Sequence, residues 1–132
     1  MVSVPSGTEI GGRKSSLNEK QIQKILRRVP EEQAFHFYRG IDQPINESAV
    51  SLTDLFKKIE KVDVQSVAFH QARKDFEKWT REVLGDGELA TRLDQISPIL
   101  RGEALRVKIL REIKTRMNQF RVEIPKIKTI LL

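Results

Sequence analysis

The sequence contains no cysteine among its 132 residues, and this absence excludes several kinds of chemistry at once. Disulfide bonds, thiolate metal sites and cysteine nucleophiles all need the missing side chain. Histidine is almost as scarce, with two residues, so a hydrolytic or zinc site would have little to build on. A chain without cysteine is compatible with a reducing compartment, and we therefore expect a cytoplasmic protein.

Long apolar runs are also absent. The first sixteen residues lack the apolar stretch of ~7 to 15 residues that secretory signals carry, and no later segment approaches the ~18 apolar residues that span a bilayer. Glycine, serine and proline crowd this part of the chain instead, which predicts a mobile arm over residues 1–16. We therefore expect neither export through such a signal nor a membrane span.

Positive charge is concentrated near the end of the chain. The whole sequence has 24 basic and 18 acidic residues, a net charge of +6. Residues 98–132 contain nine basic and three acidic residues, and this segment therefore accounts for the entire excess. Net charge bears on partners and solubility rather than on fold, so the basic segment predicts a binding role.

Apolar periodicity predicts a single all-α domain with about five helices. The expected boundaries are the arm at 1–16, a helical domain at 17–124 and an apolar tail at 125–132. The tail could dock on the body, pair as an edge strand or enter a partner. Residues 34–41 are rich in aromatics and predict one short extended stretch, and residues 42–50 are expected to form a loop.

Capping residues set the expected starts of the first three helices. The first helix is expected to be capped by Ser16, with Glu19 completing a capping box, and to continue until Pro30. Ser51 and Asp63 are expected to cap the second and third helices.

The third helix carries one apolar stripe through Trp79, and it could bend near Lys74 if Asp75 caps a new helix. Gly85 is expected to end it. Asp86 then starts a short helix that runs to Ile96, so Gly85-Asp86-Gly87 is expected to be a turn rather than a phosphate-binding loop.

The last helix is expected to be long, to begin at Ser97-Pro98 and to end at Pro125. Apolar residues at helical spacing form one face of it, and basic residues fill the others. The apolar face consists of Leu105, Ile109, Leu110, Ile113, Met117 and Phe120. The basic faces could follow a phosphate backbone, because each neutralised phosphate releases condensed counterions.

These patterns predict a non-catalytic accessory protein that docks on nucleic acid or on a nucleoprotein such as a ribosome or chromosome. The expected contacts are Arg106, Lys108, Arg111, Lys114, Arg116 and Arg121, with Arg27 and Arg28 of the first helix extending the patch. An acidic protein partner and a merely solvated basic face are the alternatives. Backbone contacts do not separate DNA from RNA, and the last helix lacks the tryptophan-rich face that anchors helices on membranes.

Two residue types could mark a different kind of site. His70 could act with Asp75 or Glu77, but a histidine satisfied by local hydrogen bonds is the favoured interpretation, and His36 adds too little for a metal site. Trp79 could stack on a base or sugar, yet its place on the apolar stripe favours core packing. The sequence therefore predicts no catalytic residue, metal or cofactor.

Residues 34–96, about half of the chain, resemble a family of small uncharacterised helical domains found in archaea and bacteria. The shared features are an aromatic opening, a helix that starts at Ser51, the pair Val62-Asp63, a histidine at His70, and a later run. That run comprises Asp75, Phe76, Trp79, Val83, Leu84, Gly85, Asp86, Leu89 and Ala90. The resemblance implies a helical fold but no established activity.

Some members of this family are attached to glycosyltransferase-like enzymes. The resemblance therefore implies an alternative function, a regulatory or scaffolding module for a carbohydrate-active enzyme. Phe35, Phe37 and Tyr38, together with the apolar tail, would then form the contact with the enzyme.

Overall fold

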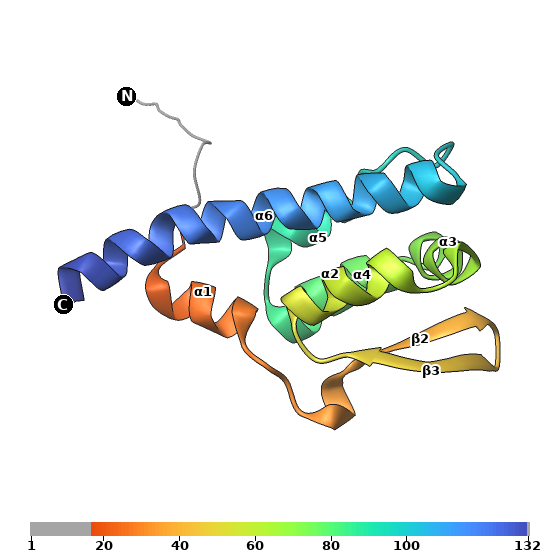
Figure 1. Ribbon diagram of the computed structural model, residues 1–132, viewed down its shortest axis with the longest axis horizontal. Helices are drawn as coiled ribbons and strands as arrows, with labels where there is room; N and C mark the ends of the chain where they lie inside the picture. The colour runs from red at the N-terminus through yellow and green to blue at the C-terminus, as the bar shows by residue number, and fades with distance from the viewer. Residues whose placement is uncertain (1–16, 132) are drawn as a thin grey trace.

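The computed structural model describes the backbone of residues 17–131 and the side chains of residues 17–121. Within this part, six α-helices accompany one antiparallel hairpin and two short helical turns (Figure 1). In chain order the elements are α1 (Glu19–Leu26), the 3-10 turn η2 (Glu31–Gln33), β2 (Phe35–Gly40), β3 (Gln43–Ala49), α2 (Leu52–Lys61), α3 (Val64–Ala72), α4 (Asp75–Trp79), the π-helical turn η3 (Thr80–Leu84), α5 (Gly87–Asp94) and α6 (Gly102–Leu131). The mobile arm expected at 1–16 and the side chains of the tail at 125–132 lie outside the described residues.

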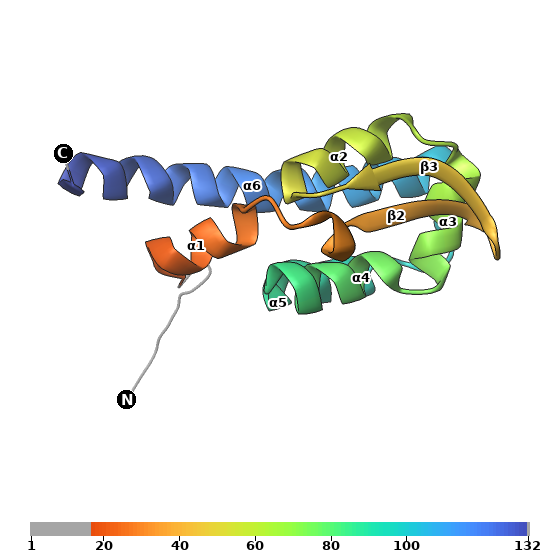
Figure 2. The same ribbon diagram turned by 90° about the horizontal axis from the view of Figure 1, so that it is seen from below.

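The long helix α6 and the hairpin lie on opposite sides of the molecule (Figure 1). Helix α6 packs against α2, α3 and α5, while β2 packs on α3 and β3 packs on α2. Figure 2 shows the hairpin in front of the helices, with α2 on one side of it and α4 and α5 on the other, so it covers this side of the helices. A mostly helical protein with a long last helix is thus confirmed, but the fold is not all-α, because a hairpin covers one side of it.

Local capping explains the helix starts. Ser51 accepts a hydrogen bond from the backbone N–H of Asp54, and Asp63 accepts one from Gln65, which confirms the expected starts of α2 and α3. The start expected for the first helix is wrong. Asn18 caps α1 there, and its capping box is completed by Gln21, whose side chain accepts from the Asn18 N–H.

The chain bends between α3 and α4, as the sequence indicates. Lys74 adopts a left-handed conformation with φ of 63°, and this breaks the helix between Ala72 and Asp75. Asp75 is the first residue of α4 rather than its cap. Further on, Gly85 ends the π-helical turn with φ of 86°, and Asp86 caps α5 by accepting from the Leu89 N–H. The expected stop and restart are both confirmed.

The loop expected at 42–50 is wrong, because residues Gln43–Ala49 form strand β3. The register pairs Phe35 with Ala49, His36 with Ser48 and Tyr38 with Pro44, with irregularities around Tyr38. Pro44 and Asn46, which has φ of 59°, are unusual in strands and explain why the sequence pattern indicates a loop. The strand forms because it pairs with β2 and packs on α2.

Helix α3 contributes side chains that satisfy the outer edge of β2. The Tyr38 N–H donates to Nε2 of His70 at 2.8 Å, and the Ser66 hydroxyl donates to the Tyr38 carbonyl at 2.6 Å. These two contacts replace the backbone hydrogen bonds that a third strand would make at Tyr38.

Both ends expected for the last helix are wrong. Residues Ser97 to Leu100 form a turn closed by the Leu100 N–H, and Gly102, at φ of 57°, separates this turn from the regular helix. At the other end the backbone stays helical through Pro125 to Leu131. Pro125 lacks one helical hydrogen-bond donor, and yet the backbone keeps its helical path past it. Residues 125–131 are helical and therefore do not pair as an edge strand.

One contiguous core joins the six α-helices, the hairpin and the π-helical turn, while η2 contributes no buried residue. Its largest apolar members come from both ends and the middle of the chain, including Phe37, Phe76 and Phe120. The apolar stripe expected on α6 is confirmed, with Leu105, Ile109, Ile113 and Phe120 buried and Leu110 and Met117 partly buried.

Candidate nucleic-acid interface

The basic residues of α6 lie in different environments, and this decides which of them can meet a partner. Residues buried against the body follow a helical stripe, and the opposite side of the helix is exposed. On that exposed side lie Arg111, Lys114 and Arg121. The structure therefore keeps only part of the expected basic set together on one face.

Arg116 does not belong to that face. Its side chain is 1% exposed, and its Nε and Nη2 donate to the two carboxylate oxygens of Asp86 at 2.8 and 3.0 Å. Its Nη1 donates to Gln119, and its guanidinium lies 4.6 Å from the centre of the Phe120 ring. The prediction that Arg116 contacts nucleic acid is wrong for this fold, because the side chain is buried in the ion pair.

The position of Arg116 explains this burial. Ile109, Ile113, Arg116 and Phe120 follow one another at steps of four, three and four, so the arginine falls on the apolar stripe. Its partner Asp86 is also 1% exposed and caps α5 at the same time. The position of Arg116 in phase with the buried residues of α6 predicts that its side chain is buried. Its charge alone does not indicate this.

Arg106 and Lys108 are engaged on the protein's own surface. Arg106 donates to the carbonyls of Ile59 and Val62 at 2.7 and 2.6 Å, where α2 ends, and it pairs with Glu103. Lys108 pairs with Glu112 one turn later, at 2.8 Å. Arg106 thus satisfies the carbonyl groups at the end of α2, and Lys108 is partly neutralised.

The two arginines expected to extend the patch differ in the same way. Arg27 donates to the carbonyls of Lys24 and Val83 at 2.6 and 2.9 Å, which ties α1 to the π-helical turn. Arg28 is exposed. Arg27 therefore has a structural role, and Arg28 is the member of this pair that a partner can reach.

After these assignments, Arg111 and Lys114 form the centre of the accessible basic face. Neither has an acidic partner among residues 17–121, and within the same residues Arg121 makes a single hydrogen bond, to Asn118 at 3.3 Å. We call Arg111, Lys114 and Arg121 the α6 basic face. It offers three cations with no counter-charge in the described structure.

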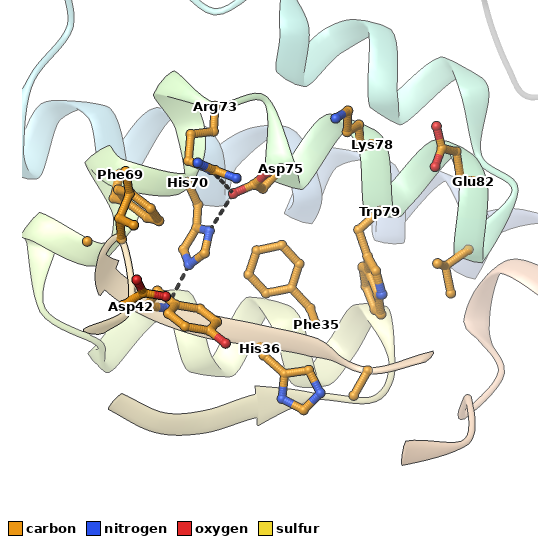
Figure 3. Close-up of a pocket in the computed structure, with 15 residues that line it drawn as sticks. Phe35, His36, Asp42, Phe69, His70, Arg73, Asp75, Lys78, Trp79 and Glu82 are labelled. Atoms are coloured by element: carbon orange, nitrogen blue, oxygen red, sulfur yellow. Dashed lines mark hydrogen bonds and ion pairs between the residues drawn. The ribbon is translucent and has the colours of Figure 1, made fainter. Parts of the chain in front are cut away.

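His70 is fully satisfied by its neighbours (Figure 3). Because its Nε2 accepts from the Tyr38 N–H, its proton sits on Nδ1, which donates to Asp75 at 2.8 Å. Burial lowers the pKa of His70 below 6.5, and the hydrogen bond and charge of Asp75 oppose this effect. With both ring nitrogens occupied, the geometry favours the structural interpretation of this histidine over a catalytic one.

The aromatic residues near His70 are mostly core. Phe35 and Phe37 are 5% and 1% exposed, and Trp79 is 7% exposed with its indole N–H donating to the Gln33 carbonyl at 2.8 Å. Phe35 and Phe37 therefore offer too little surface for a protein partner to contact, although the small exposed part of Phe35 lines a pocket, and that part of the alternative prediction is wrong. Tyr38 remains half-buried.

No protein-family model, curated protein or solved structure matches the chain. The resemblance of residues 34–96 to a family of small helical domains thus stays a prediction. Among the described residues, no group of histidines and acids is arranged to hold a metal ion. In the same part of the chain, none of the helices combines the length and the apolar character needed to cross a membrane.

Proposed function

We propose that the protein is a non-catalytic binding module that docks on nucleic acid or on a nucleoprotein through the α6 basic face. The observation that carries this proposal is the set of three cations, Arg111, Lys114 and Arg121, which share one exposed face without an acidic partner in the described residues. Arg27, Arg106 and Arg116 are held by internal contacts and Lys108 pairs with Glu112, whereas these three and Arg28 are left for a partner.

The spacing of the face suits an extended anionic polymer. Arg121 follows Arg111 by ten positions, which corresponds to about 15 Å along the helix axis. A rigid helix can thus present its cations to phosphates several nucleotides apart. Contacts to phosphates fix position without reading bases, so we expect little sequence discrimination and binding to both DNA and RNA.

The experiment is a salt titration with two matched double variants. Arg111→Gln/Lys114→Gln removes two charges from the α6 basic face, while Lys57→Gln/Lys61→Gln removes two exposed charges from α2. Fluorescence anisotropy with a short mixed-sequence DNA duplex and a single-stranded RNA gives affinity across salt concentrations. We expect the α6 variant to flatten the slope of log K against log salt by up to about 2, and the α2 variant to keep it.

Two results would remove the proposal. One is binding that does not depend on salt, and the other is an equal loss of affinity in both double variants, which would indicate a diffuse charge effect. Binding of an acidic protein with the same dependence on Arg111 and Lys114, without binding of nucleic acid, would replace the proposal with the acidic-partner alternative.

The scaffolding alternative gains no comparable support. Two of its three aromatic contact residues, Phe35 and Phe37, are core residues, and they already pack against each other with ring centres 4.9 Å apart. A carbohydrate-active enzyme could reach Tyr38 but not this pair without opening the core.

A further inference from the structure

A pocket of about 500 Å³ lies where the hairpin meets the corner between α3 and α4 (Figure 3). It is separate from the α6 basic face. This volume falls within the range of small-molecule sites in proteins, which is about 300 to 1,000 Å³. Its walls come from β2, α3, α4 and the π-helical turn, so secondary-structure elements rather than long loops hold its shape.

The floor of the pocket is aromatic and its buried polar groups are already paired. Phe35 and Trp79 line it with ring centres 5.9 Å apart, and Tyr38 lines it as well. The indole N–H of Trp79 donates to Gln33, and both nitrogens of His70 are occupied. A ligand gains nothing by hydrogen bonding to these groups, so the floor favours an apolar planar ring.

The rim, in contrast, holds a cation with unused donors. The Nε of Arg73 donates to Asp75 at 3.2 Å, and its guanidinium lies 5.2 Å from the centre of the Phe69 ring. These contacts orient the guanidinium, yet its two terminal NH2 groups have no partner in the described residues. Lys78, which also lines the pocket, is exposed and likewise lacks an acidic partner there.

Acidic residues on the rim limit the charge of a ligand. Three acids line the same pocket: Asp75, which is already paired with Arg73 and His70, and Asp42 and Glu82, neither of which has a basic partner among residues 17–121. Their charges repel a polyanion, whereas Arg73 and Lys78 attract a single negative group. A fork of two N–H donors matches a carboxylate in particular.

We propose that this pocket binds small planar rings that carry one carboxylate, with the ring on Phe35, Tyr38 and Trp79 and the carboxylate at Arg73 and Lys78. The inference is independent of the proposed nucleic-acid function, because it uses other residues on another side of the fold.

Trp79 is the only tryptophan of the chain, so it reports on the pocket without background. We would titrate the ¹⁵N-labelled protein with 4-methylbenzoate and, separately, with 4-methylbenzamide, which has the same shape but no charge. The indole N–H resonance of Trp79 should shift and saturate with the carboxylate, at an affinity about tenfold above that for the amide. The dianion 4-methylphenyl phosphate should bind more weakly than the carboxylate.

Variants then locate the charge that selects the carboxylate. Arg73→Gln and Lys78→Gln should each reduce the preference for 4-methylbenzoate over the amide. Arg81→Gln is the matched control, because Arg81 also pairs with a carboxylate, Glu77 at 3.0 Å, but does not line the pocket. Lys78→Gln leaves the contact between Arg73 and Asp75 in place, so it tests the charge even if Arg73→Gln disturbs the fold.

Three outcomes would overturn the proposal. The first is equal affinity for the carboxylate and the amide, which would leave only a nonspecific apolar cavity. The second is the absence of any shift at Trp79 at millimolar concentrations of either probe. The third is an equal loss of preference in Arg81→Gln, which would show that overall charge rather than the rim selects the ligand.

Discussion

Arg116 on α6 and Asp86 at the start of α5 form a bidentate ion pair in which each side chain is 1% exposed. The same carboxylate caps α5 by accepting from the Leu89 N–H. The pair therefore joins the two helices and fixes the first turn of one of them. Such a pair is costly to break from one side, because the remaining charge is left buried.

A double-mutant cycle tests this relationship. Arg116→Met should lower the free energy of unfolding by about 3 to 5 kcal/mol, because it leaves the Asp86 carboxylate buried without its partner. Asp86→Asn keeps an oxygen for the cap but removes the charge. We expect Asp86→Asn/Arg116→Met to lose clearly less than the sum of the two single changes in urea unfolding. Additive losses would contradict the pairing.

His70 should make stability depend on pH. Because burial lowers its pKa in the folded state, the unfolded chain takes up a proton first as the pH falls below 6.5. The contribution of His70 to stability is thus fully present above pH 6.5. As the pH falls below this value, the contribution declines by at most about 1.4 kcal/mol per pH unit, and the decline ends below the pKa of His70 in the folded state. Urea unfolding at a series of pH values measures the slope.

Two variants identify the source of that slope. His70→Gln should remove the His70 contribution to the slope below pH 6.5, whereas His36→Gln, which changes an exposed histidine, should leave it. Asp75 and Arg73 are the charged groups nearest to His70, so Asp75→Asn should also be measured. A slope that persists in His70→Gln would assign the pH dependence to other groups.

Gly85 should tolerate no side chain. Its φ of 86° is unfavourable for other residues, and an added Cβ would lie 3.0 Å from the Lys24 ammonium. Gly85→Ala should therefore lower stability by about 1 to 2 kcal/mol in thermal or urea unfolding. Gly87→Ala is the control two residues away, where a Cβ meets nothing closer than 3.7 Å and we expect no loss.

Arg106 and Arg111 should separate structural from binding roles on α6. Arg106→Gln removes the donors to the Ile59 and Val62 carbonyls, so it should lower stability by about 1 to 3 kcal/mol and leave the salt slope of nucleic-acid binding unchanged. Arg111→Gln should leave stability unchanged and lower the salt slope of nucleic-acid binding. Urea unfolding and salt titration of both variants give the comparison, and a lower salt slope for Arg106→Gln would show that Arg106 is part of the interface.

The parts of the fold that the sequence predicts are those set by local rules. Ser51 and Asp63 cap helices because a side-chain oxygen accepts from the first turn, and this depends only on nearby residues. Gly85 ends a helix for a similar local reason. Strand β3 is different, since Pro44 and Asn46 oppose it locally and only pairing with β2 forms it.

The same difference between local patterns and contacts of distant residues applies to the candidate site. The concentration of charge on the last helix is visible in the sequence, but the environment of each cation is not. Arg106 and Arg116 are occupied by groups 44 and 30 residues away, respectively, and these distances in sequence hide the pairing. The stripe position of Arg116 could have revealed its burial, although nothing local identifies Asp86 as the partner.

The contacts at the hairpin also limit how a partner can bind. A two-stranded sheet normally exposes two unpaired edges, which can recruit further strands from other molecules. On β2, the side chains of Ser66 and His70 hydrogen-bond to the backbone carbonyl and N–H of Tyr38. On β3, Pro44 has no backbone N–H to donate, and the Lys58 ammonium donates to the Ser48 carbonyl. Strand addition, and with it edge-to-edge aggregation, is obstructed at these positions on both sides of the hairpin. At these positions a partner therefore meets side chains rather than a free strand edge.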